Sequence, residues 1–268
     1  MAYTLREPRS LNEKMGKPLV ILHGMMGSKQ NWNSISLMLK NGLDHSREIY
    51  MMDIRNHGES PNVPEHNQEL MIQDCLHTFK HLKLEKPIVL GHSMGGRIMM
   101  LLALKHESII SGLIVVEMSY HSYSDTQELM IELANFMRQI TFEDVNNSLP
   151  QARAKAHKIL AQKVKSKFMR NFLVKIKWRL NLEVLGKAKP QGFPEYAFKL
   201  KYPGPCIFLG GNESHFVQKD DLIVLRKMFP QAELYILEGG GHLLHVDRPR
   251  EFVAIVTNFL NKMIKQNI

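Results

Sequence analysis

Short apolar runs alternate along the chain with longer segments in which apolar residues recur at helical spacing. The short runs are typical of strands that are buried on both faces, because they contain no alternating polar positions. They occupy residues 18–22, 49–52, 87–90, 114–116, 206–209 and 234–237. The helical segments begin near residue 28, cover residues 66–82, 97–104 and 218–229, and end with a helix from residue 248 onward. This alternation predicts an α/β fold with a mostly parallel central sheet and helices on both faces.

The pattern changes between residues 120 and 202, where the chain is helical and charged and contains no convincing strand. This segment follows the strand at 114–116, and open α/β sheets place their sites at the carboxyl ends of the strands. A chain of 268 residues has room for one α/β domain with an insertion. We therefore expect a core of residues 1–119 and 203–268, with residues 120–202 inserted as a helical cap, or lid, over the site.

The sequence Gly-His-Ser-Met-Gly-Gly at residues 91–96 joins a predicted strand to a predicted helix. A serine between two glycines at this spacing, on a strand-to-helix turn, is the pattern of a nucleophile elbow. The turn is tight, so Ser93 occupies a strained backbone conformation and its hydroxyl projects from the sheet. Gly91 and Gly95 lack a Cβ and let the strand and the helix approach each other. Ser93 is therefore the candidate nucleophile.

A serine hydroxyl becomes a good nucleophile when a base accepts its proton. His242 follows three glycines after the last predicted strand, 149 residues beyond Ser93, which is the place of the base in this chain order. His245 is the alternative base. Stabilising an oxyanion requires backbone N–H donors, and we expect them from Met94, next to the nucleophile, and from Met25, on the loop after the strand 18–22.

Four motifs in order give the chain a family resemblance. They are His23-Gly24-x-x-Gly27-Ser28, Asp53-x-Arg55-Asn56-His57-Gly58-x-Ser60, the elbow at 91–96 and Gly241-His242-x-x-His245-x-Asp247-Arg248-Pro249. Together they resemble the α/β-hydrolase superfamily, and within it small bacterial esterases and their animal relatives. The resemblance covers residues 18–260. It implies a cofactor-free serine hydrolase that acts on acyl esters, including lipid esters.

The acid of the triad is less clear from the sequence, and three candidates stay open. In the bacterial esterases that the chain resembles, an Asp follows a strand in a Val-Val-Asp-x-Ser pattern, and residues 115–119 match it with Glu117 in place of Asp. The usual superfamily position, after the strand 206–209, holds Glu213, with Ser214 beside it. Glu183 in the cap is the third candidate. We take Glu117 as the preferred acid.

These residues favour an ester hydrolase, with a thioesterase as an alternative of the same class. A non-catalytic ligand-binding protein is the alternative from a different class. It is disfavoured because a protein that only binds a ligand does not need the serine, the histidine and the oxyanion loop together. Asp53, Arg55 and His57 precede Ser93, which is the wrong order for a triad, and are interpreted as loop scaffolding. No Cys/His cluster has metal-ligand spacing, and we expect neither a metal nor another cofactor.

Charge is concentrated in one segment. The whole chain carries +9, and residues 149–201 contain 14 Lys and Arg against two acids, a local charge of 14 − 2 = +12. No nucleic-acid motif accompanies this charge, so nucleic acid is not expected as a partner. Lysines at 163, 165 and 167, mixed with Phe168 and Phe172, suggest contact with an anionic lipid surface.

Two cysteines, Cys75 and Cys206, are expected to be buried free thiols, which suits a reducing compartment. No apolar run reaches the length of a membrane span, and the first residues lack the apolar region of a secretory signal. We therefore expect an intracellular protein. The family resemblance implies a mitochondrial location in animals, with the cytoplasm as the alternative.

Overall fold

The computed structural model describes residues 1–9, 15–121, 124–142, 148–165, 167–175 and 180–265. Within these residues, the centre of the molecule is a seven-stranded sheet with the strand order β1-β3-β2-β4-β5-β6-β7. Neighbouring strands run parallel, except that β1 and β3 pair antiparallel. The strands are β1 (Tyr3–Arg6), β2 (Leu19–Leu22), β3 (Ile49–Met52), β4 (Ile88–His92), β5 (Gly112–Val116), β6 (Cys206–Gly211) and β7 (Ala232–Leu237). The predicted mostly parallel sheet is confirmed.

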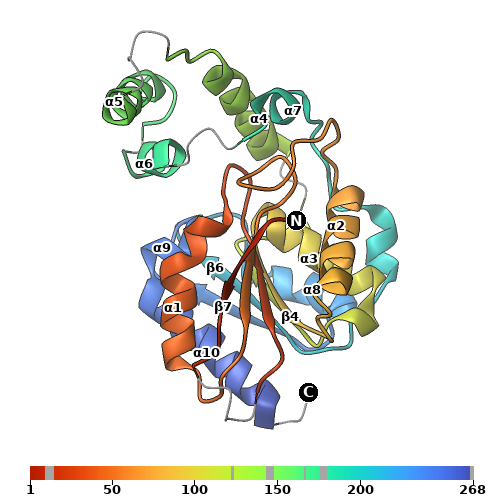
Figure 1. Ribbon diagram of the computed structural model, residues 1–268. Helices are drawn as coiled ribbons and strands as arrows, with labels where there is room; N and C mark the ends of the chain where they lie inside the picture. Colours follow the sequence, from red (N-terminus) through yellow and green to blue (C-terminus); the bar gives the residue numbers. More distant parts are fainter. Residues whose placement is uncertain (10–14, 122–123, 143–147, 166, 176–179, 266–268) are drawn as a thin grey trace.

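Helices cover both faces of this sheet (Figure 1). α1 (Asn33–Gly42) and α10 (Pro249–Lys265) lie on one face, and α2 (Gln68–His81), α3 (Met94–Lys105) and α8 (Asp221–Met228) lie on the other. The strands β2 to β6 are buried along their whole length, which explains why their sequences lack polar alternation. Short helical turns are η1 (Lys29–Trp32), η2 (Glu107–Ile109) and α9 (Leu244–Asp247).

The edge strand β1 is an element that the hydrophobic pattern does not predict. Its residues are exposed or half-buried, so they form no apolar run. It pairs with β3, with Tyr3 opposite Met52. Pairing with a neighbouring strand, rather than local sequence, therefore determines this element.

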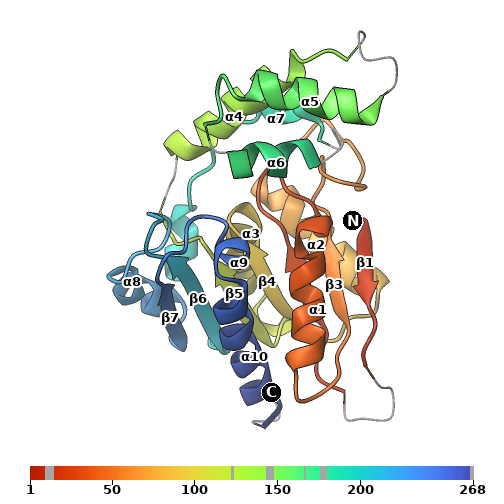
Figure 2. The same ribbon diagram turned by 90° about the vertical axis from the view of Figure 1, so that its left-hand side faces the viewer.

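The segment between β5 and β6 is helical in its described part and contains no strand of the sheet. Its helices are α4 (Ser124–Arg138), α5 (Leu149–Leu160), α6 (Lys167–Lys175), α7 (Leu182–Lys187) and η4 (Glu195–Lys199). α4 packs on α7 and α5 packs on α6. The group α4–α7 lies beyond one end of the sheet (Figures 1 and 2). We refer to residues 120–202 as the cap segment.

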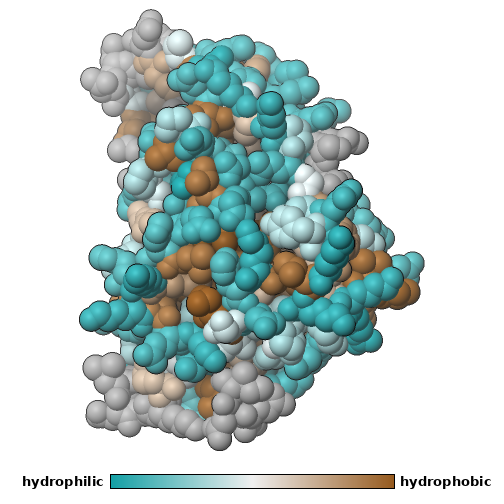
Figure 3. All heavy atoms as spheres, turned by 90° about the vertical axis from the view of Figure 1, so that its right-hand side faces the viewer, coloured by the Kyte–Doolittle hydropathy of each residue, from teal (hydrophilic) through white to brown (hydrophobic). Residues whose placement is uncertain are grey.

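The outer surface mixes side chains of both kinds. Figure 3 shows one face of the molecule, on which hydrophobic residues form patches between hydrophilic ones. Such a mixture is ordinary for a protein surface in contact with water. Among the described residues, no helix combines the length and the apolar character that crossing a bilayer requires.

Candidate active site

Ser93 lies on the turn between β4 and α3, where its backbone has φ of +52° and ψ of −118°. Residues with a side chain rarely adopt positive φ, so the surrounding structure must hold this conformation. Two glycines make room for it. A Cβ on Gly91 would overlap the carbonyl of Gly95, and a Cβ on Gly95 would overlap the carbonyl of His23. The strand, the turn and the helix therefore pack closely around Ser93, as the motif predicts.

His242 approaches Ser93 from the loop that follows β7. Its Nε2 lies 3.1 Å from Ser93 Oγ, within hydrogen-bonding distance. Gly239 in this loop has φ of +69°, a conformation that glycine adopts without strain. The Nε2–H of His92 donates to the His242 carbonyl over 2.7 Å, and the ring of Phe216 stacks on the imidazole with centroids 4.1 Å apart. These contacts hold the imidazole beside the serine.

Glu117 lies directly after β5, with φ of +51° and a fully buried side chain. Its Oε2 lies 3.3 Å from Nδ1 of His242. The backbone N–H of Gly211 donates to Oε1 over 2.5 Å, and the hydroxyl of Ser214 donates to Oε2. The carboxylate is thus held between the carboxyl ends of β5, β6 and β7, on the side of the imidazole opposite Ser93.

The remaining sequence candidates have other surroundings. Glu213 is exposed on the loop after β6. Glu183 is exposed on α7 and accepts a hydrogen bond from Lys187 Nζ at 2.7 Å. His245 is buried and stacks on Trp32, with ring centroids 4.3 Å apart. The structure brings none of these three side chains into the arrangement of serine, imidazole and buried carboxylate.

Burial is the largest influence on the pKa values of both members of the imidazole–carboxylate pair. It raises the pKa of Glu117 to about 7, against the hydrogen bonds from Ser214 and Gly211, which lower it. It lowers the pKa of His242 to about 4, so the imidazole is neutral at neutral pH. Because the two groups are in contact, they titrate as a pair. A neutral imidazole is the form that can accept a proton from Ser93.

The two predicted oxyanion donors, the N–H groups of Met94 and Met25, belong to elements that meet at the elbow. Met94 is the first residue of α3, so its N–H has no acceptor within the helix. Met25 lies on the loop after β2, and this loop approaches the elbow closely. A Cβ on Gly24 would lie 3.1 Å from the Cβ of Ser93. Met25, Met94 and Ser93 line one cavity.

The polar residues after β3 hold loops together. Asp53 accepts hydrogen bonds from the backbone N–H of Lys29 at 2.7 Å and from its Nζ at 2.8 Å, and both side chains are buried. Arg55 forms an ion pair with Asp74 at 2.7 Å. His57 accepts a backbone N–H from the loop after β2. These contacts fit the interpretation of this stretch as scaffolding.

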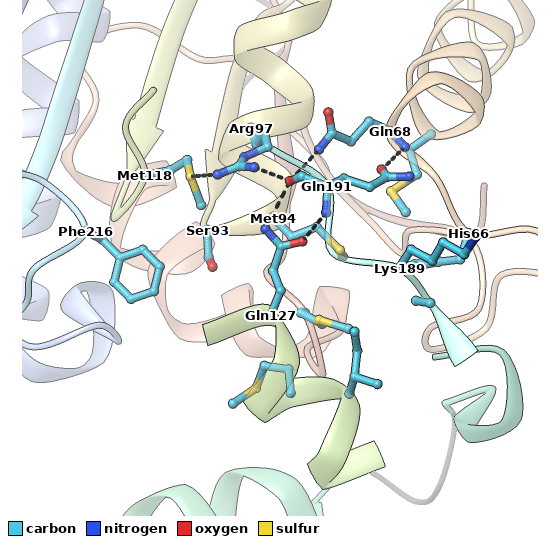
Figure 4. Close-up of a pocket in the computed structure, with 15 residues that line it drawn as sticks. His66, Gln68, Ser93, Met94, Arg97, Met118, Gln127, Lys189, Gln191 and Phe216 are labelled. Carbon is cyan, nitrogen blue, oxygen red and sulfur yellow. Dashed lines mark hydrogen bonds between the residues drawn. The ribbon is translucent and has the colours of Figure 1, made fainter. Parts of the chain in front are cut away.

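A largely apolar cavity opens beside Ser93 between the core and the cap segment (Figure 4). Its apolar lining comes mainly from methionines: Met25, Met71, Met94, Met118 and Met130, with Ile131 and Phe216. On another side, the carbonyl of Gln191 accepts hydrogen bonds from the side chains of Arg97, Gln68 and Gln127. Methionine side chains are flexible and polarizable, so this lining can adapt to an apolar chain.

A second cavity also reaches Ser93. It is lined by His242 and by apolar side chains from the core and the cap segment, including Met26, Leu133, Leu173 and Leu243. The two cavities share Met25, Ser93 and Met130. A molecule whose reacting carbon lies at Ser93 therefore has room on both sides of that carbon.

No sequence pattern predicted the roles of Gly211, Ser214 and Phe216, which contact the acid and the imidazole. All three lie on β6 or the loop after it. Their position could have indicated a role at the site, because the acid of the superfamily usually lies on the loop after this same strand. Here the loop supplies hydrogen-bond donors to an acid on the neighbouring strand.

A metal site is not present in the described part of the chain. Among those residues, no three His, Cys, Asp or Glu side chains are grouped so that they could hold a metal ion. Cys75 and Cys206 are both buried free thiols, as predicted.

Comparison with known proteins places the chain in a family. The family model described as alpha/beta hydrolase fold matches residues 17–249. The chain therefore belongs to the alpha/beta hydrolase family, and the resemblance inferred from its motifs is confirmed. The predicted fold class is confirmed by the same match and by the sheet described above.

Individual relatives and a solved structure have esterase or lipase names. The mouse (Mus musculus) protein named sn-1-specific diacylglycerol lipase ABHD11 is 35% identical over 254 residues, which cover 90% of this chain and 80% of the relative. Esterase YbfF of Escherichia coli is 29% identical over 271 residues, covering 97% of this chain and all of the relative. A solved marine microorganism esterase has a TM-score of 0.79 at 27% identity, covering 96% of this chain and 98% of that one. The prediction of an enzyme of the carboxylic ester hydrolase class is confirmed at this level.

Proposed function

We propose that this protein is a serine hydrolase that cleaves carboxylic esters through Ser93, His242 and Glu117. One observation carries the proposal. A continuous series of contacts runs from Ser93 Oγ to His242 Nε2, at 3.1 Å, and from His242 Nδ1 to the buried Glu117 carboxylate, at 3.3 Å. A hydroxyl, an imidazole and an acid in this order form the arrangement that activates serine nucleophiles.

In the proposed reaction, His242 Nε2 accepts the proton of Ser93 as Oγ attacks the ester carbonyl. Glu117 accepts a hydrogen bond from Nδ1–H and stabilises the imidazolium that forms. The N–H groups of Met25 and Met94 bind the oxyanion of the tetrahedral intermediate. The alcohol leaves with a proton from His242, and an acyl-enzyme remains on Ser93. Water then attacks the acyl-enzyme by the same route and releases the acid.

The substrate class that we propose is an acyl ester with an apolar chain, lipid esters included. The methionine-rich lining of one cavity and the leucines of the other support it. Hydrolysis rates of an acyl ester and an acyl thioester of equal chain length test this choice. The proposal expects the higher kcat/KM on the ester. A preference for the thioester would favour the alternative of a thioesterase, and no turnover of either would favour a non-catalytic binding protein.

We also propose that residues 120–202 act as a cap domain and that its charge faces an anionic lipid surface. The side chains of Lys163, Lys165 and Lys167 are exposed. The sequence groups Phe168 and Phe172 with these lysines, and the structure describes the backbone of these two residues but not their side chains. Each Lys near an anionic membrane contributes roughly 1 kcal/mol of attraction. A lipid substrate would then be presented at the cap.

The location that we propose is intracellular, and mitochondrial if the protein follows its animal relatives. The two buried thiols suit a reducing compartment. Fractionation of cells that express the untagged protein tests the proposal. Enrichment with mitochondrial markers is expected, and enrichment in the cytosol would support the alternative.

A further inference from the structure

One buried residue of the α/β core belongs to the hydrophobic cluster of the cap segment. Met26, on the loop after β2, is 1% exposed and belongs to this cluster. The other buried members that are described all come from the cap segment: Leu133, Ala134, Met137, Ile140, Leu160, Leu173, Leu180 and Leu185. Met26 therefore inserts a core side chain into the interior of the cap. Its neighbour Met25 is the proposed oxyanion donor.

The backbone at Met26 is strained. Residues 24–27 form a turn, in which the N–H of Gly27 donates to the carbonyl of Gly24 over 3.0 Å. Met25 and Met26 are the two central residues of this turn, and Met26 has φ of +62°. Positive φ at this position of a turn favours glycine, so a methionine here requires stabilising contacts. The conformation of this turn determines where the Met25 N–H points.

The backbone N–H of Met26 provides one such contact. It donates to Nε2 of His57 over 3.3 Å. The Nδ1 of His57 lies 3.0 Å from the carbonyl of Arg55, so Nδ1 carries the proton and Nε2 is left as an acceptor. Burial lowers the pKa of His57 well below its usual value, which keeps this ring neutral. The ring can therefore accept the N–H of the turn at neutral pH.

The residues around His57 are joined to the cap segment as well. His57 and Leu180 form an isolated antiparallel bridge. The N–H of Asn181 donates to the carbonyl of Asn56 over 2.9 Å, and its side-chain amide donates to Asn56 Oδ1 over 3.0 Å. The Met26 side chain thus packs in the cap cluster, and the loop that carries the His57 ring is hydrogen-bonded to the cap segment beside it.

We propose that Met26 is a positioning residue that couples packing of the cap segment to formation of the oxyanion hole. The inference rests on the proposed function. With the cap packed on the core, burial of the Met26 side chain stabilises the strained turn and directs the Met25 N–H toward the reacting carbonyl. Without this packing the turn relaxes, and the enzyme loses one of its two oxyanion donors.

The test compares substitutions at Met26 on a short, soluble p-nitrophenyl ester, with thermal unfolding of each variant as a check of folding. Met26→Ala keeps the strained backbone conformation at positive φ and removes the buried side chain that anchors the turn in the cap cluster. It should lower kcat by roughly tenfold to a hundredfold and leave KM nearly unchanged, because losing one oxyanion donor outright costs about 10²–10³ in kcat. Met26→Gly removes the anchor and the strain together, so it should retain more kcat than Met26→Ala. Met26 also lines the second cavity, so Met26→Leu, which keeps a large apolar side chain in the cap cluster, is expected to lose less kcat than Met26→Ala rather than to match the unmodified protein.

Two controls separate the other effects of the substitution. Leu173→Ala removes a buried side chain that, like that of Met26, belongs to the cluster and lines the second cavity, and it should lose less kcat than Met26→Ala. Leu160→Ala removes a fully buried side chain from the same cluster and lies outside both cavities. It should leave kcat within about threefold. The inference is overturned if Met26→Ala and Met26→Gly lose kcat equally, if the loss appears in KM, or if Leu160→Ala loses as much. If Met26→Ala does not fold, Met26→Val replaces it, since a β-branched side chain keeps the strain at positive φ and shortens the buried side chain, and a kcat equal to that of Met26→Gly rejects the coupling. An unmodified protein that hydrolyses no ester would instead defeat the proposed function itself.

Discussion

Replacing Glu117 by Gln exchanges one carboxylate oxygen for an NH₂ group and tests the proposed role of the acid. The carboxylate accepts the Gly211 N–H on Oε1, and the Ser214 hydroxyl and His242 Nδ1 lie at Oε2. A glutamine that keeps its carbonyl toward Gly211 places its NH₂ group at the position of Oε2. This group is a donor, so it requires Nδ1 of His242 to be the acceptor. The proton of the neutral imidazole then resides on Nε2, which can no longer accept the proton of Ser93.

The size of the effect follows from this change of tautomer. The opposite orientation of the amide would return a carbonyl oxygen to Nδ1 of His242 but would direct the NH₂ group at the Gly211 N–H, a donor against a donor, so the orientation that gives the wrong tautomer is favoured. Loss of a triad acid that sets the tautomer lowers kcat by about ten-thousandfold, or roughly 5 kcal/mol of transition-state stabilisation. KM should change little, because Glu117 is fully buried and lines neither cavity.

The assay is steady-state hydrolysis of a short, soluble ester by Glu117→Gln and by the control Glu213→Gln. Glu213 is exposed, so its variant should keep kcat within about twofold. The reasoning is refuted if Glu213→Gln is the inactive variant, or if Glu117→Gln retains more than about a tenth of the original kcat while folding normally.

Three further outcomes are expected. In the unmodified protein, kcat/KM should fall as the pH drops through about 7, where Glu117 takes up a proton. Ser214→Ala removes a hydrogen bond that lowers the pKa of Glu117, so it should move this fall in kcat/KM to higher pH. An unchanged pH profile in the variant would contradict this prediction. Asp53→Ala leaves Lys29 Nζ paired with Glu59 but removes the acceptor of the backbone N–H groups of Lys29 and Glu59, so urea denaturation should show a free energy of unfolding lower by about 3 kcal/mol, and an unchanged midpoint would count against it. Changing the three exposed cap lysines to Gln should weaken cosedimentation of the protein with anionic vesicles but not its hydrolysis of a soluble ester. If the unmodified protein binds zwitterionic vesicles equally well, these lysines are solvated surface residues with no role in lipid binding.

The nucleophile and the base were predictable because local sequence determines their surroundings. Ser93 lies in a turn that forms only where glycines flank it, and His242 follows a glycine-rich loop after the last strand. The buried strands were predictable for a similar reason, since strands covered on both faces need continuous apolar sequence. At these positions, the local sequence pattern and the whole fold require the same types of residue.

Glu117 was preferred through the resemblance of residues 115–119 to an esterase motif, but the contacts of the acid and of the cap depend on distances that no local pattern encodes. Glu117 reaches His242 because β5 lies between β4 and β6 in the sheet, and the order of strands is a property of the whole fold. The hydrogen bonds from Gly211 and Ser214 to Glu117 depend on the same order. No local pattern marks Met26 as a cap contact, since its position in the cap cluster depends on how the inserted helices pack.

The most direct test of the proposed chemistry is covalent labelling of the serine. The protein and its Ser93→Ala variant are treated with a fluorophosphonate probe, digested and analysed by mass spectrometry, and their hydrolysis of a soluble ester is measured in parallel. We predict that the probe modifies Ser93, that the variant is not modified, and that its hydrolysis falls by a factor on the order of 10⁶. Probe attached to another residue, or hydrolysis retained by a pure and folded Ser93→Ala variant, would contradict the account.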